Sequence, residues 1–151
     1  MKQLSNNYIG DQLSNATMRT EDLIPSFMNY LHHIKEECGV TKEVNELQEE
    51  VNSLELEEKD GYGEYYKNPK GAGWLLNEDI WNLLQNIAPN FTYFGSHEGD
   101  GAAYGFWTSE DALRDHIQTE LTPIADDDYL DFEEVKNALS DLVELLEAHN
   151  R

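Results

Sequence analysis

The sequence predicts an α+β fold, with four to five helices packed on a small antiparallel β-hairpin or sheet. Apolar residues recur at helical spacing in several segments, most regularly over residues 132–146. Two short aromatic runs, residues 91–94 and 103–107, flank a glycine-rich stretch, which is typical of a hairpin. Because 39% of the 151 residues are hydrophobic, the chain can form a packed core. We therefore expect a single acidic globular domain over residues 1–151.

The N-terminal part of the chain predicts an arm followed by a helix. Residues 1–19 are polar and have no apolar period, so we expect a loop or a flexible arm. Thr20 is a candidate N-cap for the first helix, because its hydroxyl can accept a bond from a free amide of the first turn. Gly39 is the expected end of that helix, since glycine readily adopts the left-handed conformation that often follows a last turn.

A second helix is predicted over residues 41–58, and a loop, with at most a short strand, over residues 60–73. The apolar residues of the helix follow a 3,4,3 spacing, a narrow stripe that suits packing on another helix. The partner helix belongs either to this chain or to a second copy, so a homodimer is one candidate state. The stripe consists of Val44, Leu47, Val51 and Leu54.

The remaining elements are predicted from caps and breakers. A third helix starts at an Asn77 cap and ends at Pro89. The hairpin follows, with a loop longer than two residues around the sequence SHEGDG. A fourth helix opens at Ser109 and ends near residue 120, before Pro123. The last helix begins after an Asp131 cap.

The charge of the chain is strongly negative and unevenly placed. Asp and Glu number 31 against 10 Lys and Arg, which gives a formal net charge of −21. Residues 21–60 and 108–151 hold 25 of the 31 acids, so the charge falls on predicted helices and the aromatic middle is nearly neutral. Such a field attracts cationic partners and repels nucleic acid and anionic membranes. We therefore expect neither direct nucleic-acid binding nor membrane binding.

Two segments resemble a known group of proteins. ATMRTEDLIPSFMNYL (residues 16–31) and YFGSHEGDGAAYGFW (residues 93–107) are similar to signature segments of small acidic proteins encoded by bacteriophages and plasmids. In that group a "DLIP" helix precedes an aromatic-rich hairpin, in the same order as here. The two segments cover 31 of the 151 residues. The resemblance implies a mobile-element origin and supplies no chemistry.

Rows of carboxylates on rigid helices can imitate the phosphates of nucleic acid. A row from Glu43 to Glu57 on the predicted second helix would be about 21 Å long at ~1.5 Å per residue. A protein that grips DNA through Lys and Arg would accept such a row with a similar release of counterions. The simpler interpretation is a solvated surface, although −21 exceeds what solubility needs. The proposed phosphate mimics are Glu43, Glu46, Glu49, Glu50, Glu57, Asp126, Asp127, Asp128, Asp131, Glu133 and Glu134.

Two further constellations have a functional and a structural interpretation. The first is an aromatic cluster in the segment 62–74. It is either a contact surface for a partner or the lid of the core, and the lid is favoured. The second is the sequence SHEGDG, in which His97, Glu98 and Asp100 lie close together and could form a metal site. It could also be a simple turn, with the Asp100 side chain hydrogen-bonded to the backbone and with Gly99 and Gly101 at positive φ. The turn is favoured. The aromatic cluster consists of Tyr62, Tyr65, Tyr66 and Trp74.

The sequence contains no P-loop, dinucleotide-binding glycine pattern, Ser-His-Asp arrangement or zinc pattern, so we expect no enzymatic activity, cofactor or metal. Cys38 is the only cysteine, which fits a reducing cytoplasm. No apolar run approaches the ~20 residues of a membrane span, and we expect no signal peptide.

The leading hypothesis is a phage- or plasmid-encoded counter-defence inhibitor in the bacterial host cytoplasm. Its acidic surface would occupy the nucleic-acid site of a host protein, a restriction or CRISPR-type effector. Charge reversal at Glu46, Glu50 and Glu57 should then weaken binding more than reversal at Glu78 and Asp79. The alternative is a binding module that uses the aromatic hairpin region for a signalling nucleotide or a protein partner. An accessory protein that dimerises through the apolar stripe is a third hypothesis.

Overall fold

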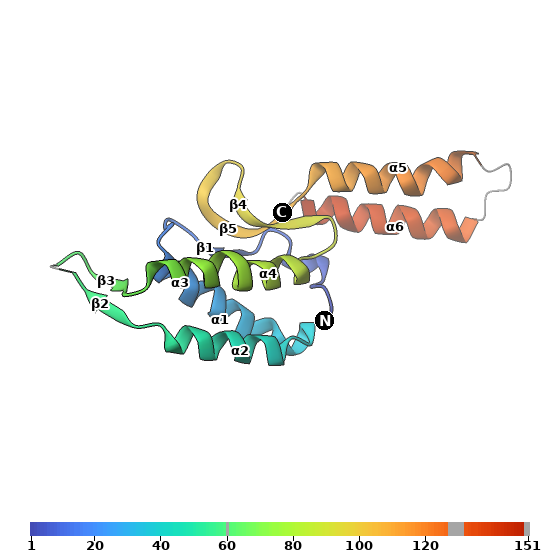
Figure 1. The fold of residues 1–151 in the computed structure, drawn as a ribbon. Helices are drawn as coiled ribbons and strands as arrows, with labels where there is room; N and C mark the ends of the chain where they lie inside the picture. The colour runs from blue at the N-terminus through green and yellow to red at the C-terminus, as the bar shows by residue number, and fades with distance from the viewer. Residues whose placement is uncertain (60, 127–131, 150–151) are drawn as a thin grey trace.

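The computed structural model describes residues 1–59, 61–126 and 132–149 and has the predicted α+β architecture (Figure 1). Helices pack on a three-stranded antiparallel sheet, and a separate two-stranded hairpin extends from one end of the molecule. In chain order the elements are η1 (Asn6–Tyr8), β1 (Gln12–Ser14), α1 (Thr20–Cys38), α2 (Thr41–Ser53), β2 (Leu56–Glu58), β3 (Glu64–Tyr66), α3 (Pro69–Trp74), η2 (Leu75–Ile80), α4 (Trp81–Ile87), β4 (Thr92–His97), β5 (Asp100–Thr108), α5 (Glu110–Asp126) and α6 (Phe132–His149).

One part of the core lies between the three-stranded sheet, ordered β1-β5-β4, and the helices α1 and α4, and the same cluster continues between α1, α2 and η2. Phe94 and Phe106 are cross-strand partners in β4 and β5, and both are buried. Phe27 of α1 packs edge-on against Phe94, with ring centroids 5.2 Å apart. Trp81 of α4 contacts the same Phe94 ring at 4.9 Å. Aromatic rings from two helices and two strands therefore fix the helices against the sheet.

Helix α1 ends as predicted, but its start differs. Gly39 adopts φ +65°, and its amide N–H bonds to the carbonyl of Glu36, which terminates the helix. The N-cap position is held by Arg19 and carries no side-chain cap, so the predicted Thr20 cap is wrong. Thr17 takes over part of this role, because its hydroxyl accepts the Arg19 N–H and donates to the Asp22 carboxylate.

The N-terminal segment 1–19 is packed into the fold, so the prediction of a flexible arm is wrong. Leu4 and Ile9 are buried, and the Leu4 N–H bonds to the carbonyl of Ile87 at 2.8 Å. Strand β1 pairs with β5, with Gln12 opposite Gly105. Two isolated apolar residues make no period, and backbone pairing leaves no trace in composition. The sequence pattern therefore has no signal for this segment.

Helix α2 ends at Ser53, five residues before its predicted end at residue 58. Leu54 already has extended backbone angles, and the following residues form β2, which pairs with β3. Leu56 follows Leu54 by two residues, which is strand spacing and breaks the helical 3,4,3 pattern. Glu57 consequently lies on β2, opposite Tyr65, and the continuous acidic row from Glu43 to Glu57 does not form.

Residues 69–87 form one continuous helical rod made of α3, the π-helical η2 and α4. The predicted loop over 60–73 is therefore wrong from Pro69 onward, whereas the short strand allowed within it is present as β3. The predicted Asn77 cap is also wrong. The true cap is Asn68, whose side-chain oxygen accepts the Gly71 N–H at 3.0 Å. Pro69 occupies the first helical turn, where its missing N–H costs nothing. The rod ends before Pro89, as predicted.

The β4–β5 hairpin closes with a two-residue turn, tighter than the predicted loop. His97 pairs with Asp100, which leaves Glu98 and Gly99 at the turn. The Asp100 carboxylate accepts the Ala102 N–H, as expected of a turn. The expected positive φ is found at neither Gly99 nor Gly101, and the strand register shifts between Ser96 and His97.

Helices α5 and α6 form an antiparallel pair that extends away from the sheet (Figure 1). Ser109 caps α5 as predicted, with its hydroxyl oxygen accepting the Ala112 N–H at 3.3 Å. The helix continues to Asp126, so the predicted end before Pro123 is wrong. The end of α6 returns to η1, where Ala148 is buried. The predicted Asp131 cap lies outside the described residues.

Tyr8 makes the stability of the fold sensitive to alkaline pH. Its hydroxyl donates to the Glu37 carboxylate at 2.6 Å, and this bond, with burial and the charge of Glu37, raises the pKa of Tyr8 to about 12. A raised folded-state pKa stabilises the fold below the unfolded value of 10.0, and that contribution is lost as pH rises from 10 to about 12. Urea unfolding at pH 8, 10 and 11 should therefore show the stability difference between wild type and Tyr8→Phe shrinking with pH. A constant difference would contradict this assignment.

Candidate functional site

Helix α2 and the rod η2–α4 enclose a groove that gathers carboxylates from both elements. Its volume is about 300 Å³. Leu47 and Leu83 are buried beneath it and form an apolar floor. The acidic groove, as we call it, is lined by Glu43, Glu46, Glu50 and Asp79, together with Leu47, Asn82, Leu83 and Asn86.

The electrostatics of the acidic groove favour a cationic side chain. The described residues that line the groove include four carboxylates and no Lys or Arg. Glu46 has a lysine neighbour one turn away, Lys42, with a Nζ–Oε1 distance of 3.6 Å. Both side chains are largely exposed, so this pair contributes little and leaves Glu46 able to exchange partners. The amides of Asn82 and Asn86 can donate and accept additional hydrogen bonds.

The structure brings together only part of the predicted acidic surface. Glu49 is exposed on α2 but does not line the groove, and Glu57 pairs with Lys59 at 3.4 Å on the β2–β3 hairpin. Asp126 ends α5 and Glu133 and Glu134 begin α6, at the end of the helical pair that lies away from α2 (Figure 1). Asp127, Asp128 and Asp131 lie outside the described residues. The sequence analysis placed Asp79 outside the binding surface, as a control position for charge reversal. In the structure Asp79 lines the groove.

The predicted aromatic cluster divides between core and surface. Tyr66 is 6% exposed and belongs to the core, so it is not part of a contact surface. Tyr65 lies half-buried under the Arg19 guanidinium, which is 5.1 Å from the ring centroid. Tyr62 and Trp74 are exposed by 79% and 66%. The lid interpretation therefore holds for Tyr66, and a surface role is open only to the exposed pair.

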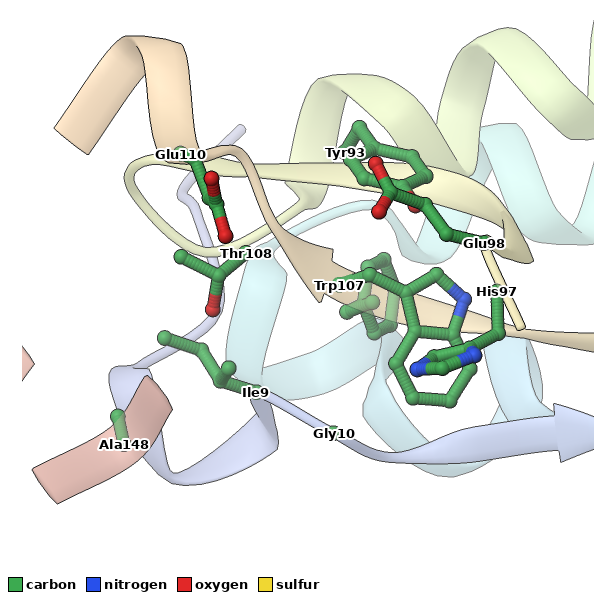
Figure 2. A pocket seen from close by; sticks show the side chains of 10 residues that line it. Ile9, Gly10, Tyr93, His97, Glu98, Trp107, Thr108, Glu110 and Ala148 are labelled. Carbon is green, nitrogen blue, oxygen red and sulfur yellow. The ribbon is translucent and has the colours of Figure 1, made fainter. Parts of the chain in front are cut away.

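A second pocket, which we call the hairpin pocket, lies against the outer face of β4 and β5 (Figure 2). Its volume is about 350 Å³. Tyr93 and Trp107 are cross-strand partners on this face, and Ile9 and Ala148 close the opposite side. The lining consists of Ile9, Gly10, Tyr93, His97, Glu98, Phe106, Trp107, Thr108, Glu110 and Ala148.

Hydrogen bonds hold the aromatic wall of the hairpin pocket in place. The Trp107 indole N–H donates to the carbonyl of Gly95 at 2.8 Å. The His97 ring stands nearly perpendicular to the indole, at 79° and 4.7 Å between centroids, and its Nδ1 accepts the Gly99 N–H. Burial, and then the charge of Glu98, raise the pKa of Tyr93, which remains a neutral donor.

Comparison of the chain with protein-family models, with curated proteins and with solved structures finds no match. No group of three or more His, Cys, Asp or Glu side chains within the described ranges is placed to hold a metal ion. Among the helices of the described residues, none has the length and apolar character needed to cross a membrane.

Sequence reasoning could have found one missed groove residue but not the hairpin pocket. Asp79, Asn82 and Asn86 follow a 3,4 spacing, so they lie on one polar helix face that the pattern indicates. The hairpin pocket joins Ile9, Glu110 and Ala148, which are far apart in the chain. No local pattern indicates that these residues meet.

Proposed function

We propose that the chain is a phage- or plasmid-encoded counter-defence inhibitor that binds a host nucleic-acid-handling protein in the bacterial cytoplasm. Its acidic groove would take basic side chains that otherwise hold nucleic-acid phosphates. The supporting observation is the convergence of four carboxylates from two helical elements around an apolar floor. Lys and Arg carry aliphatic stems as well as charges, so such a groove can contact both parts of one side chain.

Placement of the carboxylates on helices favours selective binding over general solubility. Glu43, Glu46 and Glu50 belong to one 13-residue helix, and Asp79 belongs to a second element that packs against it. Ordering these like charges side by side costs stability, because neighbouring acids on a helix repel by a few tenths of a kcal/mol per pair. A partner that neutralises them recovers this cost on binding.

The other sequence hypotheses receive less support. The described lining of the hairpin pocket includes Glu98 and Glu110 and contains no Lys or Arg, which disfavours an anionic signalling nucleotide. Val44 and Leu47 of the apolar stripe are buried within this chain, and Val51 and Leu54 pack against its core. The stripe is thus used internally, and we do not propose a homodimer through it.

The test is capture of host proteins by the immobilised chain, with duplex DNA as competitor. We expect a nucleic-acid-binding protein to be retained at low salt. It should be released by excess duplex DNA and by raised salt, because the inhibitor and DNA would share one basic surface. A neutral competitor of similar size, such as dextran, should release nothing.

Two results would count against the proposal. One is a captured protein that binds duplex DNA and the chain at the same time, since the acidic groove would then not occupy the nucleic-acid site. The other is capture that does not respond to salt between roughly 50 mM and 200 mM, where phosphate-type contacts weaken steeply.

A further inference from the structure

We propose that the hairpin pocket binds a small organic cation with an apolar body, of the quaternary ammonium type. The pocket shares no lining residue with the acidic groove, so the inference is independent of the proposed function. Its volume of about 350 Å³ is at the lower end of the range for small-molecule sites. The occupant must therefore be small, and its chemistry follows from the lining.

Aromatic rings supply the first recognition element. Trp107, Tyr93 and His97 all line the pocket, and Figure 2 shows them together at one end of it. The indole of Trp107 lies across Gly105, where a side chain would meet its Cζ2 atom at 2.9 Å. Its N–H is bonded to Gly95, so the ring is held in place before any ligand arrives. Indole is the best aromatic partner for a cation within about 6 Å of the ring.

Two carboxylates supply the second element, the sign of the charge. Glu98 comes from the hairpin turn and Glu110 from the first turn of α5, and in Figure 2 they lie on different sides of the pocket. Both are exposed, and neither forms an ion pair within the part of the chain that the structure describes. Among the described residues that line the pocket there is no Lys or Arg, so the local potential of this lining favours a cation.

The apolar part of the lining selects among cations. Ile9, Phe106 and Ala148 offer no ligand to a metal ion or to a strongly hydrated ammonium group, whose desolvation would be costly. An alkylated ammonium group carries its charge under methyl groups and is weakly hydrated, so it can contact these side chains and the indole at once. This chemistry is shared by free cations such as choline and by a methylated lysine side chain.

The experiment is an NMR titration of the ¹⁵N-labelled full chain with choline at constant ionic strength. The indole N–H signal of Trp107, assigned with Trp107→Phe, should shift and saturate in the millimolar range. N-acetyl-trimethyllysine amide forms a second arm, and tighter binding there would identify a side chain as the source of the cation. The uncharged isostere 3,3-dimethyl-1-butanol should produce no saturating shift.

Charge-matched variants separate the pocket from the general field of the protein. We expect the double variant E98Q/E110Q to weaken choline binding about tenfold, because two nearby charges are lost. Both residues are exposed, so this variant is expected to remain folded. The control E58Q/E78Q removes the same charge elsewhere and should change the affinity less than twofold. The proposal is overturned if choline does not saturate below about 50 mM, if the neutral isostere binds equally, or if both double variants weaken binding alike.

Discussion

Gly105→Ala is expected to lower the free energy of unfolding by about 3 kcal/mol, at the upper end of the usual effect of overpacking a core. A methyl group at this position would overlap the carbonyl oxygen of Asp11, a backbone atom that cannot rotate away. That carbonyl accepts the Phe106 N–H, and the Gly10 N–H bonds to the Phe106 carbonyl at 2.8 Å. The substitution therefore forces β1 away from β5 and breaks the pairing that joins the N-terminal segment to the sheet. Urea unfolding followed by circular dichroism measures the loss.

Gly101→Ala is the matched control for this prediction. It lies on the same strand β5, and a methyl group there would meet no atom within 4 Å. We expect its stability to stay within about 0.5 kcal/mol of wild type, as for most surface substitutions. Equal effects of the two substitutions would show that β1 does not rely on the close approach at Gly105.

The fold class was predictable because the spacing of apolar residues indicates helices and strands even in a single sequence. The helix from Thr20 to Cys38 and the hairpin from Thr92 to Thr108 are both found where the pattern puts them. Each uses a strong local signal, a 3.6-residue apolar face or paired aromatic runs. The errors lie where tertiary contacts decide the structure, as in the N-terminal segment, where β1 is ordered by pairing with β5.

Proline caused two errors with one physical origin. At Pro69 and at Pro123 the sequence was taken to end or exclude a helix, whereas both residues lie within helices. Proline lacks an N–H, which matters little in a first turn and can be tolerated later in a helix at some cost. Asn68 immediately before Pro69 was the available signal, since Asn followed by Pro is a good helix start.

The sequence predicted correctly that acids on α2 share one face, but it did not predict which residues the acidic groove contains. The acids at positions 43, 46 and 50 do form one face of α2, as their spacing requires. The extension to Glu57 failed because the helix ends at Ser53. Asp79 joined the site because α2 packs against η2, a contact between elements that no local spacing encodes. The revised surface is shorter than the predicted row and has two walls.

The revised surface makes a sharp prediction about binding to the captured nucleic-acid-binding protein. Neutralising the four groove acids should weaken that binding by roughly 100-fold or more, since the loss of several close charge pairs is costly at an interface. The dependence of log K on log salt should also become shallower, because fewer opposite charges are paired across the interface. The variant is E43Q/E46Q/E50Q/D79N, and the measurement is affinity at several salt concentrations.

A second quadruple variant with the same net charge tests whether binding depends on the groove carboxylates or on the overall negative charge of the protein. It neutralises exposed acids of α2, β2 and η2 that lie outside the groove, and it includes two of the predicted phosphate mimics, Glu49 and Glu57. Because these exposed side chains do not line the groove, solvent and salt screen their charges more strongly than those of the groove acids, and we expect less than a threefold loss of affinity. An equal loss in both variants would favour the solvated-surface interpretation, in which net charge alone governs association. The control variant is E49Q/E57Q/E58Q/E78Q.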